Sequence, residues 1–172
     1  MIVYHEANPE SYDSLITNGL KRTSRGDKTN SDPMIQQTDK LLDQRRPVSL
    51  IAAHVSRDNN IYAYVTKGET VQDITDGSFI PVVEFIQKSK QLVLAMNVDP
   101  QRCFVSDLDQ YDALKIAIKQ RQSQPTLHKL ADEYWHSLIL LSEYELHQKT
   151  RAEIMITYDI APTNITSIWN KP

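Results

Sequence analysis

Three short apolar segments, far apart in the sequence, each have the composition of a β-strand. They cover residues 3–5, 60–65 and 151–156. In the middle segment, aromatic and β-branched residues alternate with small ones, which is typical of a strand in a packed sheet. Each segment carries one residue with a chemically useful side chain, namely His5, Tyr62 and Glu153. Because the three residues lie on separate strands, the sequence indicates a site that is assembled by folding rather than by a local motif.

The other predicted elements mix helices and strands in no regular order. Pro9 can occupy the first position of a helix over 9–18, with Asn8 as its cap and Gly19 at its end. Further helices are predicted at 33–46 and 48–55, after Asp107 or Asp109, and from Pro125 onward; further strands are predicted at 91–98, 103–105, 153–157 and 165–169. A polar loop is predicted at 21–32 and a turn at 56–60.

This order of elements excludes one common nucleotide-binding fold. A Rossmann fold alternates strands and helices regularly and places a glycine-rich phosphate loop after a strand. The chain has only four glycines in 172 residues, and none of them belongs to such a loop. The sequence therefore predicts a single α+β domain over residues 1–172.

Charge and composition narrow the expected partners and location. The formal net charge of -3 gives no general basic surface, so general binding to nucleic acid is not favoured. The single cysteine, Cys103, excludes an internal disulfide framework and is expected to be a buried, unreactive thiol. No apolar run has the length of a membrane span, and no signal-peptide pattern opens the chain. We therefore expect no membrane partner and a cytoplasmic location, although a secreted effector would show the same pattern.

Several short segments around the three residues are, taken together, similar to segments of one known protein family. They are Tyr4-His5, Asn18-Gly19-Leu20, Ile61-Tyr62-Ala63, Ala152-Glu153-Ile154-Met155-Ile156 and Ile160-Ala161-Pro162-Thr163-Asn164-Ile165. Together they resemble the ADP-ribosyltransferase superfamily of the His-Tyr-Glu type. The resemblance implies a central split β-sheet, mixed or antiparallel, that is flanked by helices and holds NAD as co-substrate. It also implies transfer of ADP-ribose to an unidentified acceptor with release of nicotinamide.

The same resemblance implies a role for each residue. Glu153 would stabilise the positive charge that develops on the ribose, His5 would hydrogen-bond the other ribose, and Tyr62 would pack against the nicotinamide ring. The further NAD-binding candidates are Tyr64, Arg57, Arg22 and Arg25, of which the three arginines could pair with the pyrophosphate. We expect the side chains of His5, Tyr62 and Glu153 to open on one pocket from the same face of the sheet.

Two alternatives remain open at this point. The family usually has a small Gly after the His, and this chain has Glu6, which favours a non-catalytic module that binds a nucleotide or serves as an interaction surface. NAD-dependent removal of a phosphate from RNA is a related activity, but the extra basic residues that it relies on are not found here. Each candidate also has a structural interpretation: a satisfied His, sheet-packing tyrosines and a solvated Glu.

A metal site is not predicted. His128, Asp132 and His136 have the spacing of one helix face. However, three ligands on a single helix make a poor tetrahedral site, and no Cys or further His follows nearby. The acidic pairs Asp107-Asp109 and Glu143-Glu145 are expected to act as turn caps and exposed residues rather than as an acid–base pair.

Overall fold

The computed structural model describes residues 1–22 and 32–171, and in this part of the chain every paired strand is antiparallel. The larger sheet has seven strands in the order β10-β6-β1-β2-β9-β7-β8. Their bounds are β1 Ile2–Ala7, β2 Ile61–Tyr64, β6 Leu92–Asn97, β7 Cys103–Asp107, β8 Ile139–Leu140, β9 Ala152–Ile156 and β10 Ile165–Trp169. The smaller sheet joins β3 Thr66–Lys67, β4 Thr70–Gln72 and β5 Phe79–Pro81.

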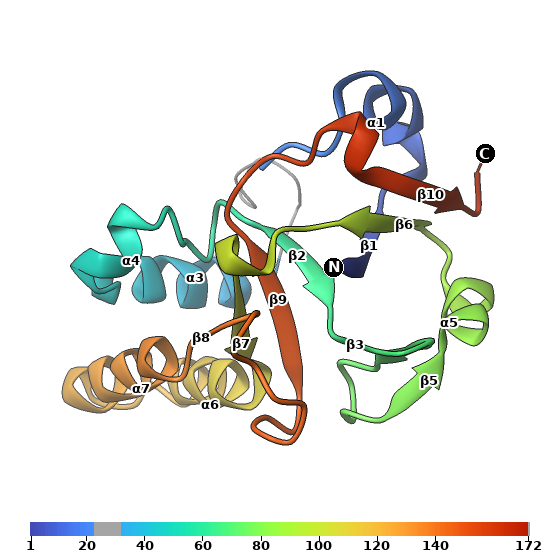
Figure 1. The fold of residues 1–172 in the computed structure, drawn as a ribbon. Coiled ribbons are helices and arrows are strands. Elements are labelled where there is room, and N and C mark those ends of the chain that lie inside the picture. Colours follow the sequence, from blue (N-terminus) through green and yellow to red (C-terminus); the bar gives the residue numbers. More distant parts are fainter. Residues whose placement is uncertain (23–31, 172) are drawn as a thin grey trace.

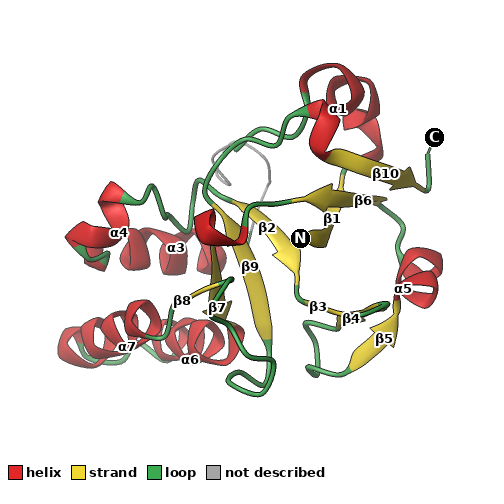
Figure 2. Ribbon diagram, viewed as in Figure 1, coloured by secondary structure: helices red, strands yellow, loops and turns green. Residues whose placement is uncertain are grey.

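Helices flank the larger sheet in three groups (Figures 1 and 2). Their bounds are α1 Tyr12–Asn18, α3 Pro33–Arg45, α4 Val48–Ala52, α5 Val82–Lys88, α6 Leu108–Lys119 and α7 Gln124–His136, with short 3-10 turns at Pro9–Ser11, Pro100–Arg102 and Pro162–Asn164. In Figure 1, α3, α6 and α7 lie beside β7 and β9, α5 lies beside the smaller sheet, and α1 lies next to β10. None of the helices in the described residues is long and apolar enough to cross a lipid bilayer.

Polar residues fix where the 3-10 turn before α1 and the helices α3, α6 and α7 begin. The side chains of Asn8, Asp32, Asp107 and Ser123 each accept a hydrogen bond from a backbone N–H of the turn that follows. A proline follows Asn8, Asp32 and, one residue later, Ser123, where its missing N–H costs nothing. These caps satisfy donors that a helix cannot pair internally, so the sequence positions of the helix starts are well determined.

Side chains alternate between the two faces of the larger sheet, and the core consists of three clusters. The odd-numbered positions Val3 and Ala7 of β1 face a cluster that includes Leu15 of α1, whereas Met155 of β9 faces the cluster formed with α3, α6 and α7. The third cluster, around Val71, Phe85 and Val93, lies between the larger sheet, α5 and the smaller sheet. Successive strand residues point to opposite faces, so each strand contributes to two layers.

The two central strands are joined only weakly. β1 pairs with β6 from Ile2 to Ala7, and β2 pairs with β9 over its whole length. Between β1 and β2, by contrast, the ladder in the described chain consists of the pair Tyr4–Tyr64. The larger sheet therefore opens beside this pair, toward the end of β1 and the start of β2.

The α+β class is confirmed, and most predicted elements are present within a few residues. The 48–55 helix is shorter than predicted, since it ends at Ala52, and Asp107 rather than Asp109 is the cap of α6. Strands β3 to β5 and helix α5 were not predicted. Strands of two or three residues are too short to display an alternating pattern. The predicted 21–32 loop lies mostly outside the described residues.

Candidate functional site

One cavity lies where the larger sheet opens between β1 and β2. Its volume is about 820 Å³, within the roughly 300–1,000 Å³ that is usual for ligand pockets. The walls come from the end of β1, the turn into α1, the start of β2 and Glu153 of β9. His5, Tyr62, Tyr64 and Glu153 all line it. Four of the residues singled out in the sequence therefore meet at the same cavity.

The expectation that His5 shares a sheet face with Tyr62 and Glu153 is wrong. Tyr64 pairs with Glu153 across β2 and β9, and it also pairs with Tyr4 of β1. Residues that pair directly point to the same face, so Tyr62 and Glu153 share the face of Tyr4, and His5 belongs to the opposite one. Its imidazole nevertheless reaches the cavity, because Nδ1 lies 2.6 Å from the backbone oxygen of Tyr62.

This contact explains how His5 can line the same cavity as Tyr62 and Glu153, although they belong to the opposite face of the sheet. A strand carbonyl lies in the plane of the sheet, so a ring that binds it stands between the strands. The imidazole therefore takes the place of the β1 backbone donor that an unbroken ladder would supply. The carbonyl can only accept, so Nδ1 is the donor in this contact.

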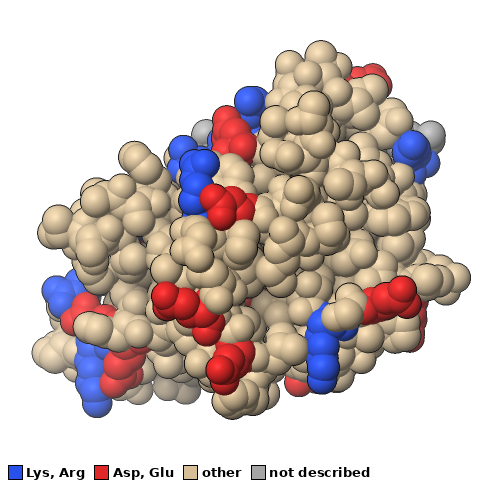
Figure 3. Space-filling view, in the orientation of Figure 1, with Lys and Arg blue, Asp and Glu red and all other residues tan. Residues whose placement is uncertain are grey.

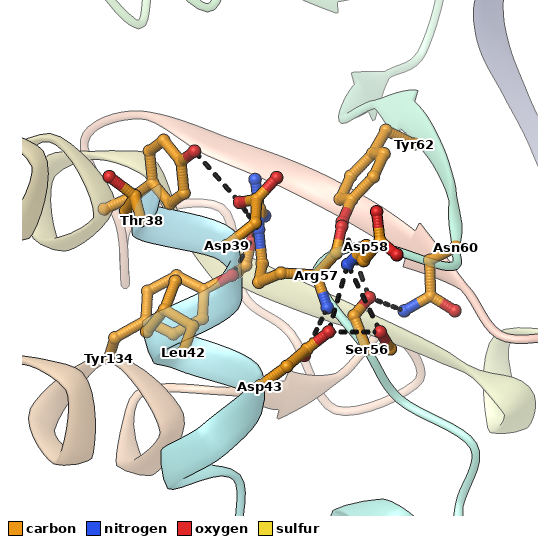
Figure 4. Close-up of polar contacts among 12 residues, drawn as sticks. Thr38, Asp39, Leu42, Asp43, Ser56, Arg57, Asp58, Asn60, Tyr62 and Tyr134 are labelled. Atoms are coloured by element: carbon orange, nitrogen blue, oxygen red, sulfur yellow. Dashed lines mark hydrogen bonds and ion pairs between the residues drawn. The ribbon is translucent and has the colours of Figure 1, made fainter. Parts of the chain in front are cut away.

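Tyr62 is held by the segment that precedes β2. Its hydroxyl donates to the backbone oxygen of Arg57, and the Arg57 Cζ atom lies 4.7 Å from the centre of its ring. Figure 4 shows the hydroxyl directed toward residues 56–58. One face of the ring is thus covered by a guanidinium.

Glu153 stands between the cavity and a buried arginine. Its Oε1 accepts from Arg57 Nη1 and, at 3.3 Å, from Ser106 Oγ. The Glu153 side chain keeps 12% of its surface exposed, whereas that of Arg57 keeps 1%. The carboxylate is therefore fixed from behind while it still faces the cavity.

Arg57 is the centre of a buried polar network, which Figure 4 shows. Nε lies 3.4 Å from Oδ1 of Asp39 on α3, and Nη1 donates to the Tyr134 hydroxyl at 2.9 Å. The guanidinium also lies over the ring of Tyr111, at 4.4 Å from its centre. Burial alone would lower the pKa of Arg57, but the charge of Glu153 and the other oxygens outweigh it, so the pKa is raised and the group is cationic.

Arg57 therefore has a different position from the one expected of a pyrophosphate ligand. It lies behind Glu153, not in the wall of the cavity, and a guanidinium with 1% exposure has no surface to offer a phosphate. A sequence signal for this burial was present in the 33–46 helix. Asp39 lies four residues after Ile35 and three before Leu42, on the apolar stripe, and a charge there requires a buried partner.

Glu6, the residue that follows His5, connects three elements. Its carboxylate accepts from the Tyr64 hydroxyl at 2.5 Å and from Ser89 Oγ at 2.5 Å, so it connects β1, β2 and the end of α5. Burial and this carboxylate raise the pKa of Tyr64. The Tyr64 ring also packs edge-on against Phe85, at 4.7 Å between centres. Tyr64 thus has a packing role in addition to lining the cavity.

The predicted arginine loop is only partly described. Arg25 lies outside the described residues. The Arg22 backbone N–H donates to Asp159 Oδ1 at 2.9 Å, and its Nε lies 3.9 Å from the same oxygen. Two lysines that the sequence reasoning did not single out, Lys21 and Lys90, line the cavity instead. Neither belongs to a motif, so no sequence signal marked them.

The helix face that could have held a metal is otherwise engaged. Asp132 forms a two-point pair with Arg45, with N–O distances of 3.0 and 2.6 Å, and His136 Nδ1 lies 2.6 Å from the Asp132 backbone oxygen. No group of three or more His, Cys, Asp or Glu within residues 1–22 and 32–171 is arranged to hold a metal ion. Cys103 is buried as predicted, and burial raises the pKa of its thiol to about 11.

Chemically, the cavity offers an anchored carboxylate, an imidazole and an aromatic face. A preorganised carboxylate can stabilise positive charge that develops on a bound ligand. Figure 3 shows acidic and basic side chains interspersed, without a continuous basic area on the face in view. No family model, no curated protein and no solved structure matches this chain.

Proposed function

We propose that this protein transfers ADP-ribose from NAD to an acceptor and releases nicotinamide, in the manner of the ADP-ribosyltransferases that its sequence resembles. The observation that carries the proposal is that His5, Tyr62 and Glu153, from three separate strands, line one cavity of about 820 Å³. The opening of the sheet beside the Tyr4–Tyr64 pair is in keeping with the split sheet that the resemblance implies.

Glu153 has the central chemical role in this proposal. Breaking the bond between nicotinamide and the ribose carbon leaves the bonding electron pair on nicotinamide and positive charge on the ribose. The Glu153 carboxylate stabilises that charge and accepts a hydrogen bond from a ribose hydroxyl. The acceptor then forms the new bond to the same carbon and loses a proton. Arg57 and Ser106 hold the carboxylate in place, so little reorganisation is needed during the reaction.

His5 and Tyr62 act before the chemical step. The Nδ1 contact with the Tyr62 carbonyl orients the imidazole, which hydrogen-bonds the second ribose. The nicotinamide ring packs against the Tyr62 ring, which Arg57 and the Arg57 backbone oxygen hold in position. Both contacts already exist in the bound ground state, so they contribute mainly to the affinity for NAD.

The second candidate is a non-catalytic module that keeps the cavity and binds a nucleotide or a partner. It is favoured by the pairing of Glu153 with Arg57 and by the structural use of Glu6, since both acidic groups already have protein partners. The two candidates differ in one observable, which is the release of nicotinamide.

The test is incubation with labelled NAD and a cell lysate, followed by measurement of nicotinamide release and label transfer. Glu153→Gln removes the negative charge at nearly constant volume, and we expect a loss of about 100-fold or more in rate with NAD still bound. His5→Ala should instead weaken NAD binding.

Asp39→Asn is the matched control for Glu153→Gln. It also removes one carboxylate from Arg57, but Asp39 does not line the cavity. We expect this variant to unfold at a lower temperature and to keep its turnover. If the wild-type protein binds NAD by calorimetry but releases no nicotinamide with any acceptor, the non-catalytic candidate replaces the enzymatic one. If NAD does not bind, the NAD-based proposal is wrong.

A further inference from the structure

Asn60, which directly precedes β2, has a buried acceptor that is unpaired within the described part of the chain. The residue lines the cavity and is only 3% exposed. Its Nδ2 donates to the Ser56 backbone oxygen at 2.6 Å, which fixes the orientation of the amide (Figure 4). Among the residues that the structure describes, Oδ1 has no hydrogen-bond partner.

An acceptor in this position is unusual because buried polar atoms are nearly always paired. Pairing Nδ2 with a carbonyl leaves the opposite side of the amide able only to accept. The neighbouring wall contains Leu15, Leu20 and Ile61, which all belong to one apolar cluster. This part of the cavity thus combines apolar side chains with an unpaired acceptor, a combination typical of a site for a flat ring that carries a donor.

The position of Asn60 along β2 indicates which part of a ligand it meets. It lies four positions before Tyr64, the partner of Glu153, which corresponds to about 13 Å along a strand. A group that meets Asn60 is therefore not the ribose hydroxyl that contacts Glu153. A sugar hydroxyl both donates and accepts, whereas an amino group on an aromatic ring or carboxamide only donates. The acceptor-only environment therefore fits an N–H₂ group better than a hydroxyl.

We propose that Asn60 Oδ1 accepts a hydrogen bond from an N–H₂ group on a planar ring of the dinucleotide, and that this contact selects the ligand. The inference rests on the proposed function, since it takes NAD as the occupant of the cavity. NAD has two such groups, the 6-amino group of adenine and the carboxamide of nicotinamide. Both have the same donor chemistry, so analogues must distinguish them.

The first experiment uses the wild-type protein and measures binding by calorimetry. The ligands are NAD, nicotinamide hypoxanthine dinucleotide, in which an oxygen replaces the adenine amino group, and 3-acetylpyridine adenine dinucleotide, in which a methyl replaces the carboxamide nitrogen. We expect one analogue to bind about tenfold or more weakly than NAD, because the buried acceptor then faces no donor. The analogue that loses affinity identifies the ring that Asn60 contacts.

Variants assign this selectivity to Asn60. Asn60→Leu has a similar shape and no acceptor, so NAD and the weaker analogue should bind with similar affinity. Asn60→Asp loses the donor to Ser56 but retains an acceptor, and it should still prefer NAD. Asn59→Leu, at the exposed neighbouring position, should behave like the wild-type protein.

The outcomes separate this inference from the proposed function. If NAD and both analogues bind the wild-type protein equally well, the role of Asn60 is refuted while the NAD site stands. Persistent selectivity in Asn60→Leu refutes it as well. If NAD itself does not bind, the proposed function fails and this inference fails with it. The comparison of analogues on the wild-type protein decides the matter even if a variant does not fold.

Discussion

Replacing Arg57 with Met should destabilise the fold strongly, because the guanidinium is buried between two carboxylates. Met keeps much of the aliphatic stem and removes the charge. Asp39 and Glu153 would then lose their common counter-ion, and Asp39 would be left 3% exposed with the Tyr111 hydroxyl as a remaining donor. Breaking a buried ion pair from one side typically costs about 3–5 kcal/mol.

The loss should be large compared with the total stability of the protein. The free energy of unfolding of an ordinary domain is about 5–15 kcal/mol. If the free energy of this protein lies in the lower half of that range, the single change removes about a third of it or more. At roughly 2–4 °C per kcal/mol for a chain of this size, the midpoint of thermal unfolding should fall by about 10 °C. Urea unfolding followed by circular dichroism measures the free energy of unfolding directly.

A matched arginine on the surface provides the control. Arg45→Met removes the partner of Asp132, but those side chains are 39% and 37% exposed, and exposed pairs contribute at most about 1 kcal/mol. In a double-mutant cycle, Arg57→Met combined with Glu153→Gln should cost less than the sum of the single changes, with a coupling of about 1–3 kcal/mol. Equal costs for Arg45→Met and Arg57→Met, or strict additivity in the cycle, would refute the reasoning.

Three further predictions concern other parts of the fold. The Cys103 thiol is buried and its pKa is raised to about 11, so a thiol reagent should label it only when the protein unfolds, at the rate of unfolding. Rapid labelling of the native protein would contradict this. Burial raises the pKa of Tyr134 to about 12 against about 10 when unfolded, so its contribution to stability is complete below pH ~10 and is lost as the pH rises toward ~12. Urea unfolding of Tyr134→Phe should therefore show a shallower decline in that range than the wild-type protein. Gly19 has φ of +73° and a Cβ there would lie 2.1 Å from a backbone oxygen, whereas Gly68, at +56°, has open space, so Gly19→Ala should cost at least about 2 kcal/mol more than Gly68→Ala in the same assay.

The elements that sequence reasoning located are those whose signals are local. Asn8 and Asp107 cap helices because their side chains bind backbone groups two or three residues away. Such contacts depend on the neighbouring sequence alone. The smaller sheet, in contrast, exists because β4 pairs with both β3 and β5. Those strands have too few residues for a sequence pattern to predict the pairing.

Local signals located the residues of the candidate site, but they did not locate its non-local geometry. Residue types on apolar strands pointed to His5, Tyr62 and Glu153, but the broken ladder that lets His5 cross between faces depends on how β1 and β2 meet. The environment of Arg57 is equally non-local, since the rings around it come from Tyr62, Tyr111 and Tyr134. The sequence showed a charge on the apolar stripe of α3, at Asp39, but it did not show that Arg57 is its buried partner.

The two carboxylates that share Arg57 separate a structural role from a chemical one. Asp39 has 5% of its side chain exposed and is enclosed by Arg57 and Tyr111, as expected of a group that only balances charge. The Glu153 side chain is 12% exposed and lines the cavity. Its contact with Arg57 does not require this exposure. A carboxylate has about four lone-pair positions, so one oxygen can remain on Arg57 while the group accepts a ligand hydroxyl. The pairing of Glu153 is thus compatible with catalysis, and it supplies the fixed orientation that electrostatic stabilisation of a transition state requires.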